Sequence, residues 1–528
     1  MSVSPPTLDL EEARGHIQPD AALAKDNDRK EPLFLWDDRR QKLRQITDQD
    51  LRKLCFPDWR PPMNPPVREG QPVVLSYGLG ADSTALLLKY LTETDEERGF
   101  PLENLIVITA LVGREWDETI EKVDRFIIPL LRQHNILTIQ TGRMSDSSPD
   151  GWIIYECSRQ PRRIYQDVAQ RLGWTLDRNL LYSGTVPQRR KDGRLCTLRF
   201  KGEVIDAIVR HLFGISTRTV YQREIGYNAD EVNRAQRCEG YSSKDGVSPS
   251  YHVGYNADEE RRAKTDKSLG QGYRYEIGYN ADEVRRIDES VSTWRRQVFV
   301  FPLITKYKMG REAVETFNIV TIMRLYPGTT PEAARIRKSS CSYCPFSCSS
   351  GGRDLLLFSY WAQPFEGAYA ALIEMNALAL NWTQFLYSKK FTVLELIHKD
   401  GNRAALELFD ALIDSIDGWA VYAVRRIWKL NVSSPVRQTE VLYRGDRRQC
   451  LRQLQRIGRG VGKDPEFVAS SWRVFTIDRQ KDVRPSVEET FVVAPLFAKE
   501  KQGRITKDAF AQQWRGIHGQ FPINPLAK

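Results

Sequence analysis

A short apolar run that leads through a glycine turn into an amphipathic helix constrains this 528-residue chain most. The run is Val73–Ser76, the turn contains Gly78 and Gly80, and apolar residues resume at helical spacing from Ala85. This succession predicts a strand, a loop and a helix N-terminus. Unpaired N–H groups and the positive end of the dipole favour an anion at a helix start. The pattern therefore predicts a phosphate-binding loop, and an ordinary strand-to-helix turn is the alternative.

The side chains of this loop suit a phosphate ligand. Gly78 and Gly80 let the backbone approach the phosphates, and Asp82 can cap the helix or meet a phosphate-bound Mg²⁺. Three hydroxyl groups can donate to phosphate oxygens, and they belong to Ser76, Ser83 and Thr84. Neither the GxxxxGK[ST] nor the GxGxxG pattern fits this segment.

The loop resembles the S-[FY]-S-G-G-K-D-S loop of the PP-loop ATP pyrophosphatases, especially their phosphoadenosine-phosphosulfate (PAPS) reductase-like branch. The matching residues are Ser76, Tyr77, Gly80, Asp82 and Ser83, and Thr84 follows as a further hydroxyl. The chain departs from the family at Gly78 (usually Ser), Leu79 (usually Gly) and Ala81 (commonly Lys). The resemblance implies ATP with Mg²⁺ as ligand.

The sequence beyond the loop alternates between strand and helix patterns. Strands are predicted at 73–76, 105–110 and 136–140, and helices at 84–93 and 118–134. This order predicts an α/β fold with a parallel sheet and helices on both faces. The resemblance implies a Rossmann-like sheet of the PP-loop type (adenine nucleotide alpha-hydrolase-like) over 71–350. Residues 1–70, polar and Pro-rich, are predicted to form an extended N-terminal arm, and residues 351–528 a mainly helical, basic C-terminal region.

Two further segments resemble elements of the same family. The first matches D-T-G-x-E-x-x-E-T at Gly113, Glu115, Glu118 and Thr119, with Leu111 and Val112 in place of the leading Asp-Thr. The second, from Arg194 through Cys196 to Lys201, matches R-x-C-T-x-x-x-K. An exposed basic loop is the alternative for the second segment.

A nearly identical GYNADE segment occurs three times between residues 221 and 290. The copies start at Ile225, Val253 and Ile277, with spacings of 28 and 24 residues, which are too irregular for a solenoid. The family has one comparable element, and the third copy, with Glu283 and Arg286, is our choice for it. An Asx-capped turn before a helix is the alternative for all three copies.

Three cysteines lie within eight residues at 341–348, as Cys341, Cys344 and Cys348. A C-x-x-C turn directs two thiolates at one metal atom, so we predict a metal centre here. Four thiolates suit Zn²⁺ or a [4Fe–4S] cluster, and the compact C-x-x-C-x-x-x-C run favours the cluster. It resembles the cluster motifs of PAPS reductase-like proteins that act in DNA phosphorothioation. Cys196 is the first candidate for a fourth ligand, because the family's C-T element lies beside the nucleotide pocket, and Cys238 is the second.

The net charge of +10 suggests an anionic partner. Residues 421–460 carry ten Arg and Lys residues against two acids, with aromatic residues among them. This composition suits nucleic acid, and a solvated helix face is the alternative. Neither a secretory signal nor an apolar run of membrane-spanning length is visible, so we expect a cytoplasmic protein.

The resemblance implies an enzyme that activates an acceptor by adenylation or takes part in sulfur transfer, plausibly onto nucleic acid in phosphorothioation or phage defence. A sulfur donor such as a cysteine desulfurase is an implied partner. Two alternatives are a sulfonucleotide reductase, whose E-C-G-x-H tail is missing here, and a non-catalytic nucleotide-sensing or nucleic-acid-binding subunit. The implied catalytic residues are Asp82, Ser83, Glu115 and Lys201. The implied nucleotide-binding residues are Ser76, Tyr77, Gly78, Gly80, Asp82, Ser83, Thr84, Gly113, Arg194, Glu283 and Arg286.

Overall fold

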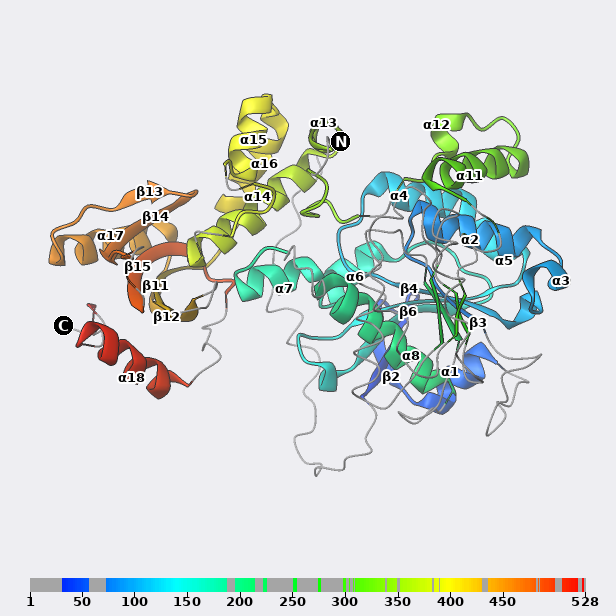
Figure 1. Cartoon of the computed structure of the whole chain (residues 1–528), viewed down its shortest axis with the longest axis horizontal. Coiled ribbons are helices and arrows are strands. Elements are labelled where there is room, and N and C mark those ends of the chain that lie inside the picture. The colour runs from blue at the N-terminus through cyan, green and yellow to red at the C-terminus, as the bar shows by residue number, and fades with distance from the viewer. Residues whose placement is uncertain are drawn as a thin grey trace. The chain divides into compact units, whose positions relative to one another are not determined.

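A computed structural model of the chain shows two compact units (Figure 1). The first comprises Asp20–Leu176 and Arg189–Cys341, and the second comprises Met1–Pro19, Asp177–Gln188 and Ser342–Lys528. The structure describes residues 31–56, 73–187, 195–213, 222–225, 250–253, 274–276, 298–300, 303, 307, 309–337, 340–348, 352–381, 384–388, 390–429, 435–480, 483, 485–498, 506–520 and 525–526.

A ten-stranded sheet forms the centre of the first unit, in the order β2-β1-β6-β5-β4-β3-β7-β8-β10-β9. Its strands are β1 (Leu33–Asp37), β2 (Lys42–Ile46), β3 (Val73–Ser76), β4 (Leu105–Ala110), β5 (Leu137–Arg143), β6 (Trp152–Ser158), β7 (Gln222–Ile225), β8 (Ser250–Val253), β9 (Arg274–Glu276) and β10 (Val298–Val300). The predicted strands 73–76, 105–110 and 136–140 are confirmed as β3, β4 and β5, and they pair in parallel as predicted.

The sheet as a whole is mixed, so the prediction of a purely parallel sheet is wrong. β6 runs antiparallel to β5, and β2 runs antiparallel to β1. The chain returns between β5 and β6 through a short segment rich in Ser, Pro, Asp and Gly, in which Gly151 takes a φ of 97°. A connection this short holds no crossover helix, and it therefore joins antiparallel strands.

Helices cover both faces of this sheet (Figure 1). Alternate residues of each strand point to opposite faces, so Leu75 and Val107 pack with α2, α5 and α6, whereas Val74 and Ile106 pack with α1 and α8. The helices of this unit are α1 (Asp48–Cys55), α2 (Ala81–Thr92), α3 (Asp95–Arg98), α4 (Asp117–Lys122), α5 (Ile128–Gln133), α6 (Gln166–Leu172), α8 (Glu203–Phe213), α11 (Arg311–Leu325) and α12 (Pro331–Ala334). α7 (Leu176–Ser183) begins at the boundary between the units.

The helix predicted over 118–134 is interrupted. α4 passes into a π-helical turn at Val123–Ile127, and α5 follows it. Pro129 lies at the start of α5, where its ring replaces a backbone N–H that the α-helical pattern would need. A π-helical turn widens the hydrogen-bond spacing and accommodates such an interruption.

Residues 31–56 do not form the predicted extended arm. β1 extends the sheet by pairing in parallel with β6, and the N-cap Thr47 starts α1 with a capping box. Leu33 and Leu51 are buried in the core. The continuous apolar run in β1 was the available signal, and the Pro-rich composition further along masked it.

The second unit contains the predicted helices and a sheet that the sequence did not lead us to expect. Its helices are α13 (Arg353–Ala362), α14 (Pro364–Leu380), α15 (Val393–Asp400), α16 (Arg403–Asp414), α17 (Arg447–Gly460) and α18 (Lys507–His518). Its strands are β11 (Trp419–Trp428), β12 (Val436–Gly445), β13 (Glu466–Val468), β14 (Ser471–Ile477) and β15 (Ser486–Pro495). They form an antiparallel sheet in the order β12-β11-β15-β14-β13.

The two faces of this second sheet are both covered. Val424 and Val492 pack against the end of α14. Ile427 lies three residues beyond Val424 and therefore points to the other face, where it packs with Trp514 of α18. Among the helices that the structure describes, none combines the length and the apolar character needed to cross a bilayer.

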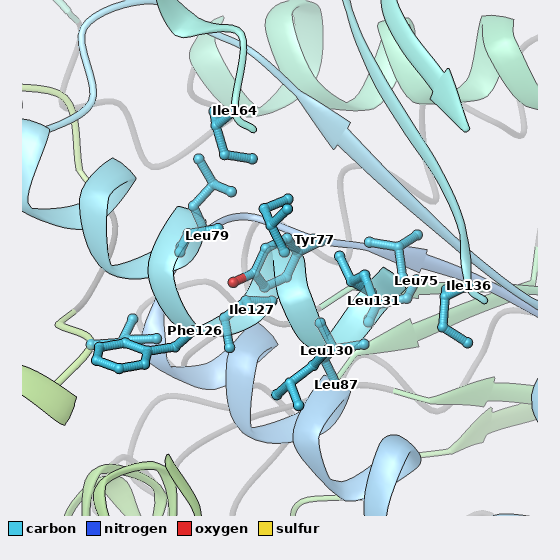
Figure 2. Close-up of a cluster of buried hydrophobic side chains, with 14 of the residues drawn as sticks. Leu75, Tyr77, Leu79, Leu87, Phe126, Ile127, Leu130, Leu131, Ile136 and Ile164 are labelled. Carbon is cyan, nitrogen blue, oxygen red and sulfur yellow. The ribbon is translucent and has the colours of Figure 1, made fainter. Parts of the chain in front are cut away.

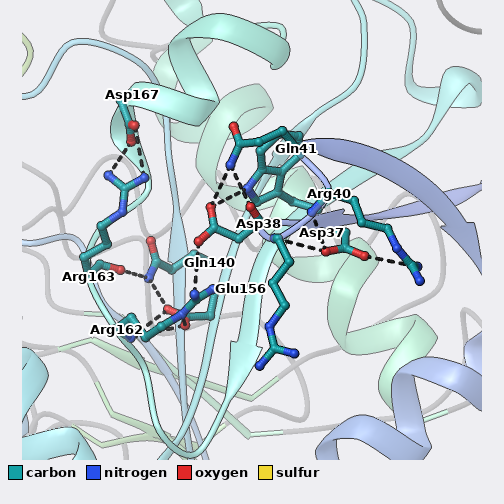
Figure 3. Close-up of polar contacts among 11 residues, drawn as sticks. Asp37, Asp38, Arg40, Gln41, Gln140, Glu156, Arg162, Arg163 and Asp167 are labelled. Carbon is teal, nitrogen blue, oxygen red and sulfur yellow. Dashed lines mark hydrogen bonds and ion pairs between the residues drawn. The ribbon is translucent and has the colours of Figure 1, made fainter.

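The stability of the first unit should fall as the pH rises, because Glu156 is buried. Its carboxylate accepts hydrogen bonds from Gln140 Nε2 at 3.1 Å and from the Arg162 amide at 3.2 Å (Figure 3). Burial nevertheless raises the pKa of Glu156 to about 7. Between an unfolded pKa of about 4.3 and this folded value, the folded protein keeps a proton that the unfolded chain has lost.

This contribution is fully present below about pH 4.3 and is lost as the pH rises through about 7. We expect urea unfolding to show a loss of up to about 3 kcal/mol between pH 5 and pH 8 from this group. The Glu156→Gln variant should show a flatter dependence over the same interval. An equal pH dependence in both proteins would contradict this assignment.

Candidate functional site

The loop after β3 lies where the sheet topology favours a ligand site. β3 pairs with β4 on one side and with β7 on the other. After β3 the chain therefore forms the strands on the β4 side first and the strands on the β7 side later. Ligands bind at the carboxyl ends of parallel strands at such a switch in direction. α2 begins there, with Gly80 as its N-cap and no side-chain cap for its amides.

The turn itself holds Leu79 in a strained conformation. Its φ is 63°, in the left-handed region that glycine adopts readily and leucine adopts at a cost of about 1–2 kcal/mol. Its side chain is only 5% exposed and lies in the core with Phe126 and Ile127 (Figure 2). Burial of this side chain holds the turn in place.

Two polar residues in the first turn of α2 point to different roles. Ser83 Oγ accepts from the Gly78 amide at 3.3 Å and donates to Gly80 O at 3.1 Å, which closes the loop on itself. Asp82 is 8% exposed, and its Oδ1 has no hydrogen-bond partner among the described residues. A buried carboxylate oxygen without a donor is unfavourable unless a cation or a ligand meets it. Asp82 therefore fits a phosphate-bound Mg²⁺ better than a helix cap.

Two other loop residues face the core. The Tyr77 hydroxyl and Thr84 Oγ1 share a hydrogen bond of 3.1 Å, and both side chains are buried. Figure 2 shows the Tyr77 ring within the apolar cluster. Burial raises the pKa of Tyr77. The side chains of Tyr77 and Thr84 therefore support the loop from the core side, and a ligand at the loop would contact only their backbone atoms.

The position at which the family commonly has Lys is closed in this chain. Ala81 is 1% exposed, and it packs against Leu303 and Val314. Its amide donates to Arg337 O at 3.1 Å, and its carbonyl accepts from Asn318 Nδ2 at 2.9 Å. α11 thus covers the place that a lysine side chain would need.

A second predicted residue, Glu115, lies at the same edge of the sheet. Gln166 fixes its backbone on both sides, donating to Glu115 O at 2.9 Å and accepting from its amide at 3.0 Å. Its Oε1 accepts from the Ser340 amide at 2.5 Å, and Glu115 forms an antiparallel bridge with Cys341. Arg337 therefore lies beside the start of α2, and Ser340 and Cys341 lie beside the loop after β4, which places the first cysteine of the cluster there.

The remaining predicted residues are distributed as follows. Gly113 lies two residues before Glu115 with a φ of 142°, which only glycine adopts readily. Cys196 and Lys201 lie in a π-helical turn at Cys196–Gly202, and both are partly exposed. Ser76 ends β3. The predicted residues that lie outside the described residues are Arg194, Cys238, Glu283 and Arg286.

Cys344 and Cys348 lie in consecutive turns at the start of the second unit. Buried Tyr360 and Tyr387 both donate to Ser342 O, at 3.0 and 3.1 Å, which anchors the turn. Burial raises the pKa of Tyr387, and the neighbouring Tyr360 and the thiols of Cys344 and Cys348 add to the increase.

The cysteine metal centre stays a prediction. Three thiols in one short segment are donors that suit zinc or an iron–sulfur cluster. Within the part of the chain that the structure describes, no three His, Cys, Asp or Glu side chains gather into a metal-binding group.

Long-range contacts supply residues that local patterns did not indicate. Arg337 and Asn318 bind backbone groups of Ala81, and Gln166 binds the backbone of Glu115; each comes from a segment distant in the sequence. A single sequence holds no signal for such pairings.

Comparison of the chain with protein-family models, with curated proteins and with solved structures gives no match.

The strain at Leu79 leads to an unusual order of variant stabilities. Leu79→Ala keeps the left-handed backbone and loses the buried side chain, so it should destabilise the protein by about 2–5 kcal/mol. Leu79→Gly loses the same side chain but removes the strain, so we expect it to be more stable than Leu79→Ala by about 1 kcal/mol. Urea unfolding of both variants measures the difference. If the alanine variant is the more stable one, the turn is not strained as described.

Proposed function

We propose that the chain is a PP-loop ATP pyrophosphatase of the PAPS reductase-like type, with a Rossmann-like nucleotide-binding sheet. The observation that carries this proposal is the buried Asp82 Oδ1, which has no hydrogen-bond partner among the described residues at a helix start beside a topological switch. A cation-bearing polyphosphate supplies what this oxygen lacks. The order of the loop, Glu115 and Cys341 along one edge of the sheet adds support.

The proposed reaction is transfer of the adenylyl group. An acceptor oxygen attacks the α-phosphorus of ATP, a new P–O bond forms, and the bond between the α-phosphorus and the bridging oxygen breaks. Pyrophosphate leaves with that electron pair, and the acceptor's proton passes to solvent. When bound, Mg²⁺ offsets the negative charge on the phosphates. In a sulfur-transfer variant, the adenylated acceptor is then the substrate of an external sulfur donor.

Each loop residue has a defined part in this scheme. Asp82 binds the cation, and the amides at the start of α2 meet the phosphates. Ser83 holds the glycine turn closed through its bonds with Gly78 and Gly80. Glu115, tied to Ser340, fixes the edge that faces the nucleotide. Because α11 occupies the space that a lysine side chain at position 81 would need, the positive charge that neutralises the phosphates has to come from another basic residue.

Nucleotide binding tests the first step of this proposal. Equilibrium dialysis of the full chain should show one ATP per chain in the presence of Mg²⁺ and much weaker binding when EDTA is present. AMP should bind weakly under both conditions, because it lacks the β- and γ-phosphates that meet the cation. Equal affinity for ATP and AMP would contradict a polyphosphate site.

We propose further that nucleic acid is the acceptor and that α17 contacts it. Of the basic segment 421–460, Arg425 and Arg426 are buried in β11 together with Tyr422. Exposed Arg444 lies in β12, and five exposed arginines lie on α17, which contains no acidic residue. The five on α17 are Arg447, Arg448, Arg452, Arg456 and Arg459. A helix face of this kind neutralises backbone phosphates.

The salt dependence of binding tests this contact. Replacing Arg448, Arg452 and Arg456 with Gln should weaken binding of a single-stranded oligonucleotide and reduce the slope of log K against log salt by about 2. These three positions are four residues apart and lie on one face of the helix. Lys399→Gln with Arg403→Gln, at exposed positions in the same unit, is the control and should leave the slope unchanged. An unchanged slope in the triple variant would exclude α17 from the contact.

A further inference from the structure

Three arginines on neighbouring strands of the second sheet share one face. Arg426 of β11 lies opposite Arg437 of β12 and opposite Glu488 of β15. Arg473 of β14 lies opposite Val492, a residue of the face that packs against α14. Strand alternation therefore directs all three guanidinium groups toward the face that α14 covers.

Two of the three arginines are fully buried, and Arg473 has donor groups without a hydrogen-bond partner among the described residues. Arg426 and Arg473 are both 0% exposed. Arg473 Nη2 donates to Leu378 O at 3.4 Å, and its Nε and Nη1 have no hydrogen-bond partner among the described residues. Arg437, which is partly exposed, donates to Leu380 O at 3.0 Å. The cluster thus extends from the interior toward the surface at Arg437.

The charges on this face do not balance. Arg426 forms an ion pair with Glu488 at 3.2 Å. The carbonyl groups at the end of α14 add only about half a negative charge. On the opposite face, by contrast, the single Arg425 meets two carboxylates, Glu489 and Glu440, each at 2.7 Å. Among the described residues, the Arg425 face therefore carries an excess of negative charge, whereas the α14 face carries an excess of positive charge.

We propose that this arginine cluster, Arg426, Arg437 and Arg473, is a binding site for a small tetrahedral oxyanion, inorganic phosphate in particular. A phosphate dianion accepts several N–H donors and neutralises the excess charge. Because Arg473 is fully buried, a free anion fits this place better than a phosphate of a polymer. Burial, and then the charge of Arg426, lowers the pKa of Arg473 to about 10, so the cluster gains from an anionic partner.

Thermal unfolding of the full chain in phosphate and in chloride at equal ionic strength tests this site. We expect 10 mM phosphate to raise the Tm of the wild-type chain by about 4 °C relative to chloride. Arg473→Met, which keeps an unbranched apolar stem and removes the guanidinium group, should lose this difference. In chloride alone, its Tm should equal or exceed that of the wild type, because a buried charge has been removed. Arg403→Met at the exposed start of α16 is the matched control and should keep the phosphate effect.

Binding of radiolabelled phosphate by equilibrium dialysis gives a readout that does not depend on folding stability. One phosphate per wild-type chain, absent from Arg473→Met and weakened in Arg473→Lys, would support the site. Phosphate retained by Arg473→Met would place it elsewhere, including at the loop after β3, and overturn the proposal. No bound phosphate in the wild type would also overturn it, as would an equal Tm shift in all variants.

Discussion

Replacing Asp82 with Asn is expected to reduce ATP-dependent pyrophosphate release at least about a hundredfold and to leave the fold intact. The substitution keeps the size of the side chain and removes the charge that holds the cation. Its Oδ1 is buried and has no hydrogen-bond partner among the described residues, so the carboxylate does not contribute a hydrogen bond to the fold through that atom. We therefore expect the variant to be at least as stable as the wild type.

The control for this experiment is Asp508→Asn. Asp508 lies in the first turn of α18, as Asp82 lies in the first turn of α2, but it is exposed. This variant should retain full activity. If Asp82→Asn kept its activity, or lost it only because the protein unfolded, Asp82 would not be the cation ligand.

Replacing Trp514 with Ala is expected to destabilise the second unit by about 3–5 kcal/mol. Trp514 is 0% exposed, and it packs with Phe510, Ile427 and Val487 between α18 and the sheet. Without the indole ring, α18 loses most of its contact with the sheet and should detach before the rest of the unit unfolds. Hydrogen exchange should report this as faster exchange at residues 507–518 than at β11 and β15.

Trp472→Ala serves as the matched control. Trp472 of β14 is 38% exposed and packs mainly against Phe467, at a ring distance of 5.4 Å. Its loss should cost about 1 kcal/mol and leave exchange in α18 unchanged. Equal effects of the two substitutions would show that α18 is not held by the Trp514 contact.

The central strands could be predicted from the sequence because their signal is local. Val73–Ser76 and Leu105–Ala110 are apolar runs bounded by turn residues, and both have the bounds that the pattern predicts. The direction of β6 and the strands of the second unit were missed for different reasons. Turn residues precede β6 and indicate the reversal of the chain. In β11 the consecutive Arg425 and Arg426 interrupt an apolar run, which made this strand resemble a basic surface segment.

The position of the loop between a strand and a helix could also be predicted from the sequence, but the roles of its side chains could not. Ser83, Asp82, Tyr77 and Thr84 are all polar residues of one turn, and only the fold separates those that face the core from those at the edge. The link from Arg337 to α2 joins segments more than two hundred residues apart. Contacts at that separation depend on tertiary packing, which a single sequence does not encode in a readable pattern.

The identity of the phosphate product released from ATP tests the central claim most directly. ATP is incubated with the full, anaerobically purified chain, Mg²⁺ and single-stranded DNA, and pyrophosphate and orthophosphate are measured separately. We expect pyrophosphate with AMP or an adenylated acceptor, and no production of ADP. Release of orthophosphate with ADP, or binding of ATP without any release, would contradict cleavage between the α- and β-phosphates. The second result would instead favour a nucleotide-sensing subunit.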